Sequence, residues 1–86
     1  KALAAHVAAL DLRERSGDRF GEVESINAIA LLRRRGGELY QALDGHTKAL
    51  RIATEIGYRS AGAESRRLIA RIYNELDDFE QAERFY

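Results

Sequence analysis

The chain has 86 residues, of which 45% are hydrophobic and 33% charged, and its 14 basic side chains equal its 14 acidic ones. This length allows one domain at most, and the composition is that of a globular protein. A net charge of zero argues against a general nucleic-acid binder, so no direct nucleic-acid partner is expected. No apolar run is long enough for a membrane helix and no signal-peptide pattern is present. We therefore expect a cytoplasmic protein without a membrane partner.

Proline, cysteine and methionine are all absent. A chain without proline that is rich in Ala, Leu, Arg and Glu is expected to be helical throughout. The lack of cysteine excludes a disulfide framework and a thiolate metal site. Because no methionine is present, we expect Lys1 not to be the natural start and the sequence to be a segment of a longer chain.

The pattern predicts five helical segments, over residues 1–16, 19–35, 38–56, 60–76 and 79–86, with turns centred at 17–18, 36–37, 57–58 and 77–78. Gly17 and Gly57 suit left-handed C-terminal caps. Asp18 and Ser60 are predicted N-caps. Glu38 begins the third segment with an acid, which suits the positive end of the helix dipole.

The chain resembles itself at an offset of 40 residues. Thirteen of the 46 overlapping positions are identical, among them His6/His46, Arg19/Arg59 and Ser25/Ser65. This composition gives about four identities by chance, so the chain contains an internal repeat. Small alanines at positions 30, 42 and 49 are expected to let two helix backbones lie close together.

The repeated positions resemble those of the tetratricopeptide repeat (TPR) family: Ile29-Ala30, Leu39, Ala42, His46 and Ala49-Leu50, then Ile69-Ala70, Tyr73, Phe79, Ala82 and Tyr86. The resemblance implies an all-α fold, a right-handed α-α superhelix (solenoid) of tandem helix-turn-helix repeats. On this resemblance the chain would comprise a half repeat over 1–16, a full repeat over 19–56 and a truncated repeat over 59–86. The 40-residue unit and the junction over 17–22 resemble a subclass with longer repeats, found in bacterial signalling proteins, transcription regulators and animal scaffold adaptors.

In that family the faces of the first helices of successive repeats line a concave groove that takes peptides or helices from partners. The residues here that would line it are Glu24, Asn27, Leu31, Arg34, Glu64, Arg67, Arg71 and Asn74. Arg67 and Arg71 are one helical turn apart and could share an anionic group of a partner with acidic character. The alternative is that they pair with Glu64 as ordinary surface ions. We expect Asn27, Arg34 and Asn74 to be solvent-accessible on the same side as the two arginines.

The remaining candidate residues favour structural roles. His6 and His46 stand where the family has packing aromatics, so we expect both to be substantially buried, with no metal or cofactor bound. Arg33, Arg34 and Arg35 are interpreted as a solvated helix end. No nucleophile elbow or phosphate loop is present, so the chain is not expected to be an enzyme.

The sequence thus predicts a protein-interaction or scaffold segment that binds a protein or peptide partner in the concave groove. The alternative is a sensory or regulatory segment of a bacterial transcription regulator or signalling protein. Apolar residues near both ends, such as Leu3 and Phe85, are expected to support self-association.

Overall fold

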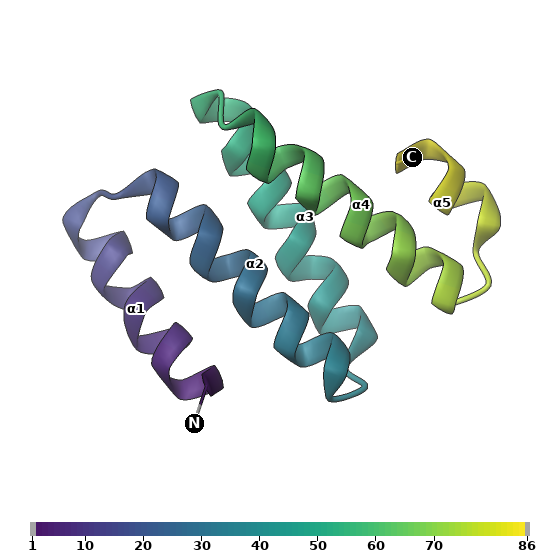
Figure 1. Ribbon diagram of the computed structural model, residues 1–86, viewed down its shortest axis with the longest axis horizontal. Helices are drawn as coiled ribbons and strands as arrows, with labels where there is room; N and C mark the ends of the chain where they lie inside the picture. Colours follow the sequence, from purple (N-terminus) through teal and green to yellow (C-terminus); the bar gives the residue numbers. More distant parts are fainter. Residues whose placement is uncertain (1, 86) are drawn as a thin grey trace.

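The computed structural model describes residues 2–85, which form five α-helices joined by short turns (Figure 1). The helices are α1 (Ala2–Ser16), α2 (Arg19–Arg35), α3 (Leu39–Ile56), α4 (Arg59–Glu75) and α5 (Phe79–Phe85). No strand occurs between residues 2 and 85. The all-α fold and the four predicted turns are therefore confirmed.

Left-handed residues recur in the turns at intervals of 20 positions. Gly17 and Gly57, with φ of 75° and 74°, end α1 and α3 as predicted. Gly37 (φ 83°) and Asp77 (φ 59°) occupy the corresponding places after α2 and α4. Because an L-residue is strained at positive φ, glycine suits three of these turns, and aspartate is among the residues that tolerate the fourth.

One of the two predicted N-caps, Asp18, is confirmed, and the other, Ser60, is not. Asp18 caps α2, because its Oδ1 accepts a hydrogen bond from the backbone N–H of Gly21 at 2.9 Å. Ser60 is wrong as the cap of α4, which begins one residue earlier, at Arg59. The turn after α3 closes with a hydrogen bond from the Tyr58 N–H to the carbonyl of Ala53, so that Tyr58 takes the cap position of α4, although its side chain does not cap the helix with a hydrogen bond.

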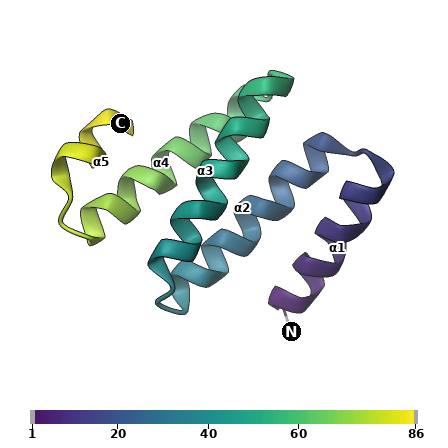
Figure 2. The same ribbon diagram turned by 180° about the vertical axis from the view of Figure 1, so that it is seen from behind.

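The helices pack as a row of antiparallel hairpins. Each helix packs against its neighbours in the chain, and α2 also contacts α4. In Figure 1 α3 lies behind α2 and α4, and in Figure 2 it lies in front of them. The result is a slab of 38 × 30 × 14 Å with α1 and α5 at its two ends.

Small residues hold α2 and α3 together. Ala30, Ala42 and Ala49 are at most 1% exposed, as their spacing predicts. A Cβ built on Gly45 would lie 2.9 Å from the Cβ of Ala30, so even one methyl group at residue 45 is too large for this contact. Apolar side chains of α2, α3 and α4 fill the space on either side of the contact. The central hairpin therefore positions the faces that α2 and α4 turn to solvent.

Candidate functional site

A hollow of about 330 Å³ lies between α2 and α4. Its apolar lining includes Ala28, Leu31 and Leu68, and its polar lining includes Glu24 and Glu64. Small and apolar side chains at the bottom of a hollow with charged groups at its edge form a surface suited to a partner side chain.

Four of the eight residues predicted for the groove line this hollow: Glu24, Asn27, Leu31 and Glu64. The other four follow α2 and α4 beyond it. Arg34 and Glu75 form an ion pair that joins these two helices near their C-terminal ends. Because only 16% of the Arg34 side chain is exposed, this guanidinium is largely committed to that contact.

Arg67 and Arg71 remain exposed on α4. Arg67 lies 3.8 Å from Glu64, with more than half of each side chain in solvent. An ion pair of this kind stabilises the protein by less than about 1 kcal/mol, so a partner can displace it. The arginine segment of the predicted stripe is therefore accessible.

The prediction that the whole stripe is solvent-accessible is wrong at Asn27, which is only 9% exposed. Its Oδ1 accepts hydrogen bonds from His46 Nδ1 at 2.8 Å and from Ser65 Oγ at 3.0 Å. Three helices thus meet at one buried amide oxygen. Arg67 occupies the same place one repeat later and is exposed. The difference arises because α4 lies against the free side of α2, whereas no described helix covers that side of α4.

His46 is fully buried, as predicted, and it is held in one tautomer. An amide oxygen only accepts, so Nδ1 carries the proton, and Nε2 is left without a hydrogen-bond partner in the described part of the chain. Burial, with a contribution from the charge of Arg34, lowers the pKa of His46 from 6.5 to about 4. The ring is therefore neutral at physiological pH and acts as a polar packing element.

His6 is less buried than predicted. Its side chain is partly exposed in a hollow between α1 and α2, which Ser25 also lines. His6 and Ser25 are the repeat equivalents of His46 and Ser65, but no described residue occupies the position equivalent to Asn27, so His6 lacks that hydrogen-bond acceptor. Within residues 2–85 no group of three or more His, Cys, Asp or Glu side chains is placed to hold a metal ion.

The sequence pattern missed five residues that line the hollow, namely Ala28, Tyr58, Ser60, Ala61 and Leu68, and Tyr58 is the one that makes a polar contact across it. Its hydroxyl donates a hydrogen bond to Glu24 Oε2 at 2.6 Å, which raises the pKa of Tyr58. Its ring packs 5.1 Å from that of Phe20. Tyr58 therefore fixes a carboxylate at the end of the hollow. The signal in the sequence was an aromatic residue directly after the capping Gly57, in the place where the previous junction has Asp18.

The prediction of a solvated end of α2 is right for Arg35 and wrong for Arg34, whose side chain is only 16% exposed. Arg33 pairs with Glu38 at 3.3 Å, Arg34 pairs with Glu75, and Arg35 is exposed.

None of the helices in the described part of the chain is long and apolar enough to cross a membrane.

Tandem antiparallel hairpins with a hollow between their first helices define a helical-repeat protein of the solenoid class. The family model for the tetratricopeptide repeat matches residues 21–86, which is most of the chain. The chain belongs to the tetratricopeptide repeat family, and this membership indicates a protein-interaction scaffold. Searches of curated proteins and of solved structures return no match.

Proposed function

We propose that the chain binds a peptide or helix from a partner protein in the groove between α2 and α4, without catalysing a reaction. The observation that carries the proposal is the hollow of about 330 Å³, which four of the predicted groove residues line together. An apolar side chain of the partner would enter the hollow over Leu31 and Leu68. The hollow is small, so the rest of the partner would lie along the polar stripe.

The charges along the stripe would determine the orientation in which the partner binds. Glu24 and Glu64 stand at the hollow, while Arg67 and Arg71 follow on α4. A partner with acidic groups over the two arginines and a basic group at the hollow would match both ends. Arginine suits the acidic end, because its planar fork of donors binds a carboxylate with two hydrogen bonds.

The two arginines provide the test. Arg67→Ala together with Arg71→Ala should weaken binding of a peptide selected by phage display by about 1–3 kcal/mol, and more at low salt. Calorimetry measures the affinity, and thermal melting checks that the fold is unchanged. Arg59→Ala with Arg66→Ala, on another face of α4, is the matched control. If the Arg67 and Arg71 variant binds as tightly as the parent, the arginines are ordinary surface ions and the site lies elsewhere.

We also assign the chain to the subclass with 40-residue repeats, and place it in the cytoplasm. Support for the repeat length comes from the helix starts. α2 and α4 begin 40 residues apart, and so do α3 and α5. The unit is therefore longer by six residues than the 34 of the common repeat.

A further inference from the structure

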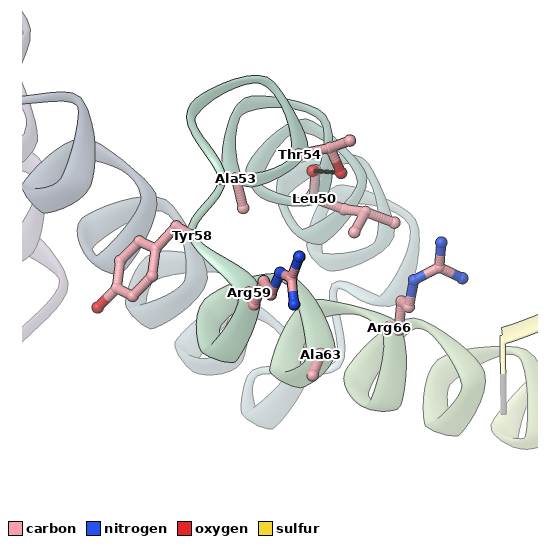
Figure 3. A pocket seen from close by; sticks show the side chains of 9 residues that line it. Leu50, Ala53, Thr54, Tyr58, Arg59, Ala63 and Arg66 are labelled. Atoms are coloured by element: carbon pink, nitrogen blue, oxygen red, sulfur yellow. Dashed lines mark hydrogen bonds between the residues drawn. The ribbon is translucent and has the colours of Figure 1, made fainter.

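The hollow between α2 and α4 has two carboxylates at its edge and no base in its lining. Glu24 and Glu64 line it from equivalent positions of successive repeats, and none of the lining residues between 2 and 85 is basic. Tyr58, which also lines it, points away from Arg59 and Arg66 of α4 (Figure 3). These two cations therefore lie on a different side of α4 from the hollow.

Each carboxylate has an arginine nearby that leaves it largely unsatisfied. Arg13 of α1 lies 3.5 Å from Glu24, and Arg67 lies 3.8 Å from Glu64. Both distances exceed the usual length of an N–H···O hydrogen bond. The Nη1 atom of Arg13 instead donates a hydrogen bond to the carbonyl of Gly21 at 2.9 Å. Most of the hydrogen-bond acceptor capacity of the two carboxylates is therefore open to a partner.

Tyr58 links the two negative charges to an aromatic ring. The pKa of Tyr58 is raised by the hydrogen bond to Glu24, and further by the charges of Glu24 and Glu64, so both carboxylates act at one end of the hollow. A cation is attracted to the face of an aromatic ring. Because Leu31 and Leu68 make the lining beneath these groups apolar, the hollow matches a side chain with an aliphatic stem and a cationic head.

Asn27 indicates that the cation belongs to a peptide. This residue lines the hollow and is only 9% exposed. Its Oδ1 accepts the bonds from His46 and Ser65, which leaves its Nδ2 hydrogens without a partner among residues 2–85. A donor in the lining requires an acceptor from the ligand. A metal ion or a free ammonium group has no acceptor, whereas an amino-acid residue presents a backbone carbonyl beside its side chain.

We propose that an arginine side chain of the partner enters the α2–α4 hollow and places its guanidinium between Glu24 and Glu64. The inference rests on the proposed function and names the residue that the groove selects. The apolar part that covers Leu31 and Leu68 is then the stem of this arginine. Arginine suits the site better than lysine, because its planar guanidinium has five donors, can bond to two carboxylates at once and stacks on an aromatic ring such as that of Tyr58.

The test begins with peptides selected on the parent chain from a phage library of random sequences. The selected peptides should share an arginine. Its replacement by citrulline, which has a similar shape and no charge, should weaken binding about tenfold to a hundredfold in calorimetry. The chain with Glu24→Gln and Glu64→Gln should bind the arginine and citrulline peptides within about twofold of each other. Thermal melting should show that this variant keeps its fold.

The control separates the arginine pocket from the rest of the groove. Arg67→Ala with Arg71→Ala should weaken the arginine and citrulline peptides by the same factor, because it removes a different contact. Peptides that this control weakens, but that carry no arginine or tolerate citrulline, would overturn the inference and leave the proposed groove standing. Peptides whose binding neither pair of substitutions changes would refute the proposed function and the inference together.

Discussion

Acid should unfold the chain through His46. The ring is 0% exposed, its Nε2 has no partner in the described part of the chain, and burial lowers its pKa to about 4. An unfolded chain takes up the proton near pH 6.5, whereas the folded chain resists it until about pH 4. The stability that neutral His46 provides is therefore complete above pH 6.5 and is lost as the pH falls towards 4.

The expected magnitude follows from this interval. Each pH unit between the two pKa values corresponds to about 1.4 kcal/mol. Protonation of His46 in the unfolded chain should therefore lower the free energy of unfolding by about 3 kcal/mol between pH 7 and pH 4. Such a loss is a large part of the stability of a domain this small. Carboxylates also titrate near the lower limit, so the contribution of His46 has to be measured by difference.

The assay is urea unfolding at a series of pH values, for the parent and for His46→Leu. The substitution removes the titrating ring at similar volume and lowers stability at pH 7 by about 1 kcal/mol, because Asn27 loses one hydrogen bond. The two curves should converge and then cross as the pH falls. His6→Gln is the control, because its ring is partly exposed. Parallel curves for the parent and His46→Leu would refute the argument, since they would mean that His46 does not resist protonation.

Two further predictions concern packing. Gly45→Ala should destabilise the protein by about 1–3 kcal/mol, because the new methyl group would collide with Ala30, whereas Gly62→Ala meets neighbours at 3.7 Å and should stabilise α4 by up to about 1 kcal/mol. Thermal melting of the two variants compares them, and equal shifts would contradict the close contact. Ala42→Leu should cost about 1–3 kcal/mol, because the site is 0% exposed, while Gln41→Leu on the exposed side of α3 should change stability by less than about 0.5 kcal/mol. A change within error for Ala42→Leu in chemical denaturation would mean that the site has spare room.

The turns were predictable because each contains a local signal. Gly17 and Gly57 adopt positive φ, and Asp18 accepts a hydrogen bond from the backbone three residues on. Both signals act over a few residues, so periodicity and turn chemistry were enough to find them. Ser60 shows the limit of this reasoning. It is a good cap by residue type, but the turn after α3 closes one residue earlier and starts α4 before the serine is reached.

The candidate site was less predictable, because burial on a repeat protein depends on the neighbouring helix. Asn27 and Arg67 are equivalent in the repeat, and helical periodicity places both on the outer stripe. Only Asn27 is covered, since α4 brings Ser65 to 3.0 Å from its amide oxygen. The link from Tyr58 to Glu24 spans 34 residues and had no spacing rule that could reveal it.

Every contact between helices joins elements that are one or two places apart in the chain. Opening one end therefore breaks a single interface, and α1, which contains no buried residue and meets the core through the partly buried Leu10, can detach while the other helices stay packed. Amide protons should consequently exchange in order from the outer helices inwards, with α3 the slowest. None of the residues that line the α2–α4 hollow belongs to α1, although Arg13 of α1 lies 3.5 Å from Glu24, which does line it. Fraying at the N-terminal end would therefore free the Glu24 carboxylate from Arg13 while the rest of the proposed binding surface stays assembled.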